Sequence, residues 1–504
     1  MAKLYHKNTI RPSEPVQPER ILSDIQTFLS ACRSPAVLEY GDETMPLTPG
    51  AHVLEIRSGK VWIDVWNETR SVSRQLLKIE ARRPGVLDCT VQRFGGKPGR
   101  LSFLDLDRPQ TAHRALAGLR ENFREQFRRM LSRQFPAWEI KAISCGMDLQ
   151  RSLSPVFPRA CLKRGNRQLA AIACPPDHDE AAMLTFGLIW HHHIRSQSPE
   201  DVHTGLCLFL PETAGALTAH RLRWLTARSL NPRIFRFNQH GLAGEVDPQD
   251  LGNLDTSVAQ SYAPPQLNAE LERLLRRLHS IPGVGCCPEL SGAISIRAQG
   301  IEFARIEREQ IWLGLDHKQR AACHTEDVER FAARFSELLE NAPQAAPERW
   351  LESGVRIHLS AIDPCLLPEP VHGQVLTFAG NDRELLDLLA ISPAGRLAVL
   401  ELKTAEDIHL PLQALDYWMR IAWHAERNEL QHLFPGIPIA RNTPKLYLLA
   451  PAMSFHPSNP VVLSYFSPEI EVERTGINPD WQKRFHVVLR LKGAEEPISH
   501  RSCP

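Results

Sequence analysis

The stretch Asp387-Leu-Leu-Ala-Ile-Ser-Pro-Ala-Gly-Arg-Leu-Ala-Val-Leu-Glu401-Leu-Lys403 decides how the C-terminal part of this 504-residue chain folds. Two apolar runs flank the tetrapeptide Ser392-Pro-Ala-Gly395. In it, proline suits the second position of a tight turn and glycine can adopt a positive φ. The stretch therefore predicts a β-hairpin with strands at 385–391 and 397–402.

Charged side chains occur on these otherwise apolar strands. Glu401 and Lys403 are two residues apart, so they point to the same face of the second strand. Asp387 shares a face of the first strand with Leu385 and Leu389. Burying such charges is costly unless a metal, a phosphate or an opposite charge accompanies them. Two carboxylates are hard oxygen ligands of the kind that Mg²⁺ or Mn²⁺ prefers.

Upstream of the hairpin, a helix over 348–355 is predicted, because proline at 347 is favourable as the first helical residue. Glu348 and Glu352 lie four residues apart and share one face of that helix. A strand at 374–378 follows. These acids are candidates for further carboxylates near the hairpin.

Downstream, a helix is predicted to begin at Leu410-Pro411 and to continue past Trp418. Gln413 and Tyr417 are four residues apart in its first turns, so both side chains project in one direction. A helix N-terminus can also bind phosphate. We therefore expect Gln413 and Tyr417 to form one site with the charged residues of the hairpin.

These residues could act together in phosphodiester cleavage. Asp387 and Glu401, with the main-chain carbonyl of Leu402, would hold the metal, and Glu352 or Glu348 could add a carboxylate. Lys403 would position or deprotonate the attacking water and offset negative charge. The candidate substrate-binding residues are Arg383, His409, Gln413 and Tyr417.

The pattern resembles the PD-(D/E)xK nuclease superfamily. Asp387, Glu401 and Lys403 match its catalytic triad, and Gln413 with Tyr417 resembles the Gln-x-x-x-Tyr motif of the RecB-like branch. The resemblance covers 348–450, about a fifth of the chain. One departure is that Leu386, not proline, precedes Asp387, although that proline is often absent in the superfamily.

The resemblance implies a restriction-endonuclease-like mixed sheet flanked by helices and Mg²⁺- or Mn²⁺-dependent cleavage of DNA, in DNA repair or in defence against foreign DNA such as that of phages. Two alternatives stay open. The chain could be a non-catalytic nucleic-acid-binding or scaffold protein that keeps the nuclease fold, or a nuclease that cuts RNA. Neither endo- nor exonuclease action is implied.

An upstream segment repeats part of the layout. Gln168–Pro175 resembles Arg396–Lys403, and without gaps Arg159 stands for Asp387, Ala173 for Glu401 and Pro175 for Lys403. Thr185 and Ile189 then stand for Gln413 and Tyr417. We expect an α/β module at 111–242 that is a degenerate nuclease-like copy; chance recurrence of a common α/β pattern is the alternative.

The remaining sequence predicts a multidomain α/β protein. The expected parts are a flexible arm at 1–20, a β-rich domain at 21–110, the α/β module at 111–242, a linker with a small α+β region at 243–346, and the nuclease-like domain at 347–504. His191-His-His193 does not suit one metal, because consecutive helical side chains diverge, and solvent-facing histidines are expected there.

Composition adds limits on location and partners. The net charge is only +1, so any DNA-binding surface must be a local patch. The 11 cysteines include no C-x-x-C pair, which favours reduced thiols. No apolar run has the length of a bilayer span, and no signal peptide is recognisable, so a cytoplasmic protein is expected. A homodimer or a partner protein could use the N-terminal region.

Overall fold

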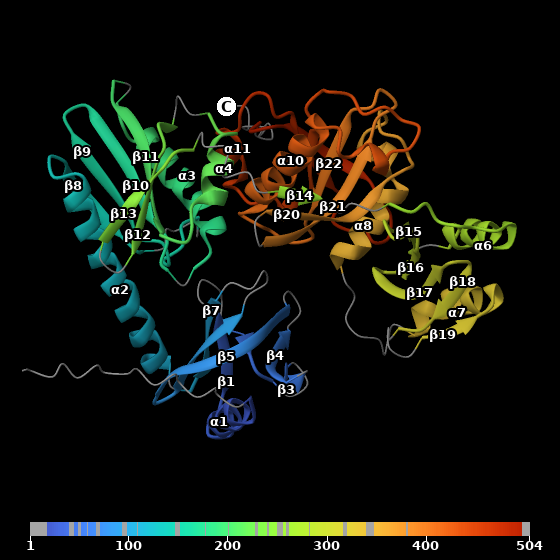
Figure 1. The fold of residues 1–504 in the computed structure, drawn as a ribbon, viewed down its shortest axis with the longest axis horizontal. Helices are drawn as coiled ribbons and strands as arrows, with labels where there is room; N and C mark the ends of the chain where they lie inside the picture. Colours follow the sequence, from blue (N-terminus) through green and yellow to red (C-terminus); the bar gives the residue numbers. More distant parts are fainter. Residues whose placement is uncertain are drawn as a thin grey trace, which may run out of the picture. The chain divides into compact units, whose positions relative to one another are not determined.

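The computed structural model shows a mixed α/β protein in two compact units, 1–123 and 124–504 (Figure 1). The structure describes residues 18–39, 45–48, 52–57, 59–66, 71–92, 98–107, 109–146, 152–176, 178–199, 201–226, 230–238, 241–248, 256–258, 262–281, 283–315, 320–338, 347–379 and 382–495.

The first unit is rich in β-strands. It holds helix α1 (Pro18–Ser30) and one antiparallel sheet. Ile21, Ile25 and Phe28 of α1 are buried in its apolar core. The predicted arm at 1–20 is therefore too long by at least three residues, and 1–17 lie outside the described residues. The sheet order is β2 (Met45–Pro46), β1 (Pro35–Glu39), β7 (Pro98–Asp105), β6 (Val86–Gln92), β5 (Ser71–Arg83), β4 (Lys60–Trp66) and β3 (His52–Arg57).

The second unit begins within helix α2 (Pro109–Gln134) and contains what we call the N-module, residues 124–246. Its sheet has the order β8-β9-β10-β11-β12-β13, with β10, β11 and β12 parallel and the other pairs antiparallel. The elements are β8 (Glu139–Ser144), β9 (Arg159–Arg164), β10 (Arg167–Ala173), α3 (Glu180–Ser196), β11 (His203–Pro211), α4 (Ala216–Leu222), β12 (Arg233–Asn238) and β13 (Gly241–Val246).

The C-module, residues 347–495, repeats this order and these directions. β20-β21-β22-β23-β24-β25 has its parallel pairs at β22–β23 and β23–β24, and helices again follow the third and fourth strands. The elements are α8 (Pro347–Ile357), α9 (Leu359–Ile362), β20 (His372–Ala379), β21 (Asp382–Ile391), β22 (Leu397–Leu402), α10 (Leu410–Glu426), β23 (Lys445–Pro451), α11 (Asn459–Leu463), β24 (Val472–Ile477) and β25 (Val487–Lys492).

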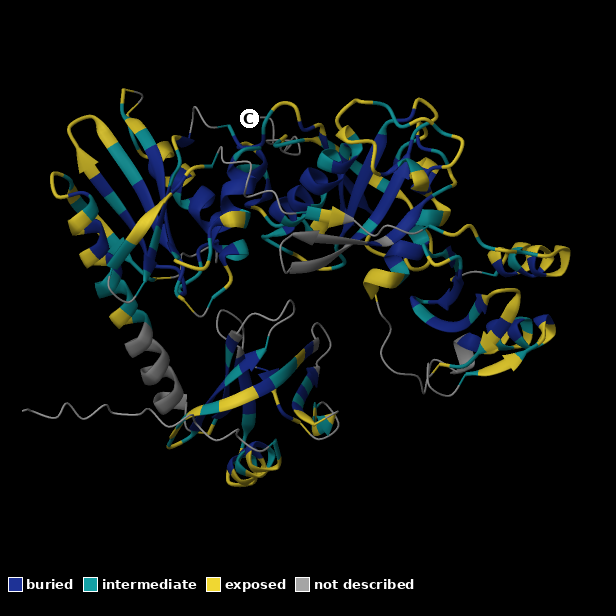
Figure 2. Cartoon of the chain, viewed as in Figure 1, coloured by how far each residue is buried: buried dark blue, intermediate teal, exposed yellow. Residues whose placement is uncertain are grey.

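Helices α3, α4, α10 and α11 form a layer that both modules share. α11 packs on α3 and α10 packs on α4, and one apolar core includes side chains from both sheets. Figure 2 shows these helices and the inner strands as buried. On its other face the C-module sheet has a separate core with α8 and α9. Helix α10, which carries two candidate site residues, therefore lies inside the molecule.

The contact between the modules is locally symmetric. Thr226 N–H donates to Tyr465 O at 2.7 Å, and Ser467 N–H donates to Trp224 O at 2.8 Å. Between them, Leu225 and Phe466 form an antiparallel β-bridge. Each of these segments directly follows the helix after the fourth strand of its module. Equivalent parts of the two modules thus meet in a pseudo-twofold arrangement.

A third, smaller module separates the two in sequence. In chain order it consists of helix α6 (Ala269–His279), a five-stranded antiparallel sheet and helix α7 (Thr325–Leu338). The stretch 243–346, expected as a linker with a small α+β region, also contains β14 (Thr256–Val258), which pairs with β20 at the edge of the C-module sheet. The strands are β15 (Val284–Pro288), β16 (Ile294–Ala298), β17 (Ile301–Glu307), β18 (Gln310–Leu313) and β19 (Ala321–Cys323).

Two chemical expectations can be compared with the structure. The ten cysteines in its described part are free thiols. Among the described helices, none is long and apolar enough to cross a membrane. The prediction for the histidine triplet is wrong in one position, because His191 is fully buried and shares a 2.8 Å hydrogen bond with the Tyr465 hydroxyl, while His192 and His193 are exposed.

His191 makes the stability of this contact sensitive to acid. Burial lowers the pKa of His191 from 6.5 to about 4. Above pH 6.5 the imidazole is neutral in both states; as pH falls toward 4, only the unfolded chain takes up the proton, so stability is lost. The unfolding free-energy difference between wild type and His191→Gln should therefore shrink by about 2 kcal/mol between pH 7 and pH 5 in urea titrations. A pH-independent difference would contradict this account.

Candidate functional site

The predicted hairpin is present and brings two acids together. Leu388 pairs with Leu400 in antiparallel register, so Asp387 on β21 lies across from Glu401 on β22. Asp387 also accepts a 2.8 Å hydrogen bond from the Leu402 N–H, which fixes its carboxylate. Gly395 has φ +80° in the turn, and a Cβ there would lie 2.0 Å from the Pro438 carbonyl oxygen. Only glycine fits this position.

Glu401 is the most deeply buried member of this pair, with 2% of its surface exposed. Its Oε1 lies 3.4 Å from the Lys403 ammonium, while Oε2 accepts no hydrogen bond from any described residue. Burial, together with the Asp387 charge, raises the pKa of Glu401 well above its usual value. Burial also raises the pKa of Asp387, to about 7. Both acids therefore have too little positive charge beside them to ionise easily.

Lys403 supplies only part of that charge. Burial lowers its pKa, but the carboxylates of Glu401 and Glu348 outweigh burial, and the pKa of Lys403 stands above its usual value. The lysine is thus an ammonium ion at neutral pH. As a cation beside an acidic pair, it is suited to hold a phosphate or water oxygen rather than to remove a proton.

Helix α10 presents the other predicted residues. Gln413 lies in its first turn, and its side-chain oxygen is buried without a hydrogen-bond partner among the described residues. Tyr417 follows one turn later and is partly buried. His409 precedes the helix and bonds to Thr185 of the N-module, 3.0 Å from Nδ1 to Oγ1. His409 thus contacts the other module, which the sequence did not indicate.

The structure distinguishes the two acids on α8. Glu352 is buried and accepts hydrogen bonds from Arg297 at 3.0 Å and from Arg356 at 3.1 Å, so both of its oxygens have cationic partners. This is a correction to Glu352 as a metal ligand, because its charge is already neutralised. Glu348 is exposed, and its charge helps to raise the pKa values of Asp387 and Glu401. Glu348 is therefore the better candidate.

Two predicted residues are placed only by their backbone. Arg383 lies on β21 opposite Phe378, but its side chain falls outside what the structure describes. Leu402 ends β22, and its N–H holds Asp387. The role of its carbonyl as a metal ligand remains a prediction.

The arrangement fits a divalent cation. Within the described residues no group of three or more His, Cys, Asp or Glu side chains is arranged to hold a metal. The fit rests instead on two facing carboxylates, one with a buried oxygen that accepts no hydrogen bond from the described residues. An acidic pair completed by main-chain, water and phosphate oxygens is the usual environment of Mg²⁺.

The corresponding place in the N-module carries none of these groups. Ile172 pairs with Leu208 on the next strand in the same way that Glu401 pairs with Leu448. The backbone N–H of Cys174 donates to β11, and the backbone N–H of Lys403 donates to β23 at the equivalent place. Ile172 and Cys174 are therefore the counterparts, one residue before the predicted Ala173 and Pro175. The ungapped alignment fails because the β9–β10 turn is shorter than that of β21–β22. Arg159, across from Ile172, does match Asp387.

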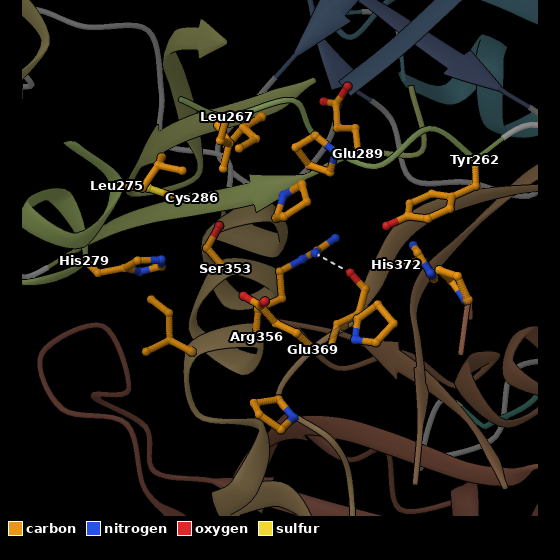
Figure 3. A pocket seen from close by; sticks show the side chains of 18 residues that line it. Tyr262, Leu267, Leu275, His279, Cys286, Glu289, Ser353, Arg356, Glu369 and His372 are labelled. Carbon is orange, nitrogen blue, oxygen red and sulfur yellow. Dashed lines mark hydrogen bonds between the residues drawn. The ribbon is translucent and has the colours of Figure 1, made fainter. Parts of the chain in front are cut away.

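A pocket of about 480 Å³ lies at the far end of α8 (Figure 3). Arg356, Tyr262 and His372 contribute to its wall. Arg356 donates to the Val371 carbonyl there while it pairs with Glu352. Because Glu348, Glu352 and Arg356 are spaced by four residues, one stripe of α8 runs from the acidic pair to this pocket. Arg297 could not be anticipated from the sequence, because its partner Glu352 lies 55 residues away along the chain.

Because Glu401 is buried with one oxygen that accepts no hydrogen bond from the described residues, we expect it to destabilise the protein until a cation binds. At pH 8 without divalent cations, Glu401→Gln should raise the thermal midpoint by about 1–3 °C, since roughly 1 °C corresponds to each kcal/mol in a chain of 504 residues. Mg²⁺ should raise the midpoint of the wild type but not of the variant. Calorimetry with and without EDTA tests this, with the exposed Glu469→Gln as control. A lower midpoint for Glu401→Gln would contradict it.

The two α8 acids should behave differently. Glu352→Gln leaves Arg297 and Arg356 without a counter-charge and should cost about 3–5 kcal/mol of unfolding free energy. Glu348→Gln should change stability by less than about 0.5 kcal/mol and should weaken Mn²⁺ binding, because a negative charge is removed beside the site. Denaturant unfolding and titration calorimetry measure the two quantities. The reverse pattern would restore Glu352 as the ligand.

Comparison with known proteins adds no assignment. No protein-family model matches the chain, and a search of curated proteins finds no match either. The function is therefore argued from the site alone.

Proposed function

We propose that this chain is a metal-dependent DNA nuclease whose catalytic site lies in the C-module. The observation that carries the proposal is the buried Glu401 carboxylate, which faces Asp387, has one oxygen without a described partner and lies 3.4 Å from the Lys403 ammonium. A buried acidic pair of this kind is costly in a protein without a ligand. The order of helix, three strands, helix and strand also agrees with the PD-(D/E)xK resemblance.

In this proposal Asp387 and Glu401 hold Mg²⁺ or Mn²⁺ with the Leu402 carbonyl. The bound cation would polarise the scissile phosphate and lower the pKa of a bound water. The Leu402 N–H keeps the Asp387 carboxylate in place. Lys403 orients the attacking water and neutralises charge that develops on the phosphate.

The helix α10 completes the site. Gln413 offers its buried amide oxygen to a water or to the metal shell, and Tyr417 lies one turn further along. Glu348 adds negative charge that favours the cation, as its effect on the two acid pKa values indicates. Five residues and one neighbouring acid would thus act together.

DNA is the proposed substrate class, in repair or in defence against foreign DNA. RNA cleavage and non-catalytic nucleic-acid binding are the other outcomes of the test. The N-module would not cut, because Ile172, Cys174 and Arg159 occupy the places of Glu401, Lys403 and Asp387. A single catalytic centre per chain follows.

The test uses purified full-length protein with linear, circular, single-stranded and branched DNA, and with RNA, in Mg²⁺ or Mn²⁺. Wild type should cut DNA, and EDTA should abolish cutting. Lys403→Ala and Glu401→Gln should each lower the rate at least about 100-fold, since one charge-stabilising group typically contributes that much.

Lys483→Ala and Glu469→Gln serve as matched controls, because they remove an exposed lysine or glutamate elsewhere in the C-module. Both should retain the wild-type rate. Cutting that survives in Lys403→Ala or Glu401→Gln would remove the mechanism. Binding of DNA without cutting of any substrate would favour the scaffold alternative.

A further inference from the structure

We infer that Arg221 of the N-module is a positioning residue for the catalytic helix α10 of the C-module. The inference rests on the proposed function, and it adds that the inactive module holds part of the site in place. Its geometric basis is an ion pair between Arg221 and Asp416 that joins the two modules inside their shared helix layer.

The ion pair is bidentate and almost fully buried. Arg221 Nε donates to Asp416 Oδ1 at 2.7 Å, and Nη2 donates to Oδ2 at 2.6 Å. Each side chain is only 2% exposed. The two parallel hydrogen bonds fix both the distance and the orientation of the carboxylate. Asp416 is therefore held in one geometry relative to α4.

Asp416 lies on the same stripe of α10 as the candidate site residues. At 3.6 residues per turn, His409, Gln413, Asp416 and Tyr417 fall within about a third of the helix circumference. Asp416 is three residues after Gln413 and directly before Tyr417. The ion pair to Asp416 thus fixes the rotation of α10 about its axis at the turn that carries Gln413 and Tyr417.

Arg221 is itself anchored in the N-module. Its Nη1 donates to the Ala181 carbonyl in the first turn of α3, at 2.6 Å. Next to Ala181, the buried Glu180 accepts hydrogen bonds from Gly215 N–H at 2.9 Å and from the Thr218 hydroxyl at 2.7 Å, which ties α3 to the start of α4. Through Arg221, the position of α10 therefore depends on the positions of α3 and α4.

A second contact lies at the start of α10. His409 bonds to Thr185, and its ring meets Phe186 edge-on at a centroid distance of 5.2 Å. Both partners belong to α3. The N-module thus holds α10 one turn before Gln413 and one turn after it. Gln413 Oε1 accepts no hydrogen bond from the described residues, so no such bond holds this oxygen in place independently of the helix.

A buried ion pair is a costly way to gain stability, since apolar side chains of similar size often pack as well. What distinguishes the ion pair from an apolar contact is that it fixes the relative orientation of the two side chains. An apolar contact between α4 and α10 would allow small rotations, whereas the two-point contact of Arg221 does not. Displacement of a catalytic group by about 1 Å can lower a rate 100-fold.

The test compares four full-length proteins: wild type, Arg221→Met, the double variant Arg221→Met/Asp416→Leu, and the control Tyr465→Phe. The double variant removes the uncompensated Asp416 charge, which keeps the comparison valid if the single variant folds poorly. Tyr465→Phe removes the buried hydrogen bond to His191 in the same interface without touching α10. The measurements are kcat and KM on linear DNA, and amide hydrogen exchange over 410–420.

For the double variant we expect a thermal midpoint near that of wild type, a fall of at least about 10-fold in kcat, a KM within a few-fold of wild type and faster exchange in α10. Tyr465→Phe should lower the midpoint and leave kcat unchanged. A folded double variant with wild-type kcat and wild-type exchange would overturn the inference. An equal loss of kcat in Tyr465→Phe would also overturn it, because general loosening of the interface would then explain both.

Failure of the proposed function gives a different result. If wild type cuts no nucleic acid, the catalytic proposal fails, while hydrogen exchange still decides whether Arg221 orders α10. Unchanged α10 exchange in the double variant would then reject the positioning role independently.

Discussion

Burial of the Glu401 carboxylate is the constraint around which the C-module is organised. Glu401 lies near the end of an apolar central strand, with Asp387 across from it and Lys403 as its ion-pair partner. Among the described residues no second cation pairs with Glu401, whereas the neighbouring Glu352 has two arginines. The charge of Glu352 is thus neutralised within the fold, while that of Glu401 is only partly offset.

The shared helix layer gives the N-module a structural part in the second unit. The two sheets have the same strand order and directions, and their helices meet at a pseudo-twofold contact. In the N-module the positions of Glu401 and Lys403 hold Ile172 and Cys174, which pack in the apolar core at no electrostatic cost. The N-module thereby contributes a rigid surface for α10, including Arg221 and Thr185, rather than a second site.

Much of the candidate site was predictable because it is local in sequence. The hairpin, the turn with Gly395 at positive φ, and the helices over Pro347–Ile357 and Leu410–Glu426 follow from alternation and turn chemistry over short stretches. Long-range partners were not predictable: Arg297 neutralises Glu352 from 55 residues away, and Tyr465 buries His191 from 274 residues away. The one-residue error in the N-module arose because an ungapped alignment cannot register a shorter turn.

The central claim is that Asp387 and Glu401 form a divalent-cation site. Anomalous diffraction at the manganese edge, from crystals of the protein soaked in Mn²⁺, tests it most directly. The account predicts a peak between the two carboxylates, within about 2.5 Å of Glu401 Oε2, and its loss in Glu401→Gln. A fully occupied peak elsewhere, or no peak at this pair at saturating Mn²⁺, would contradict it.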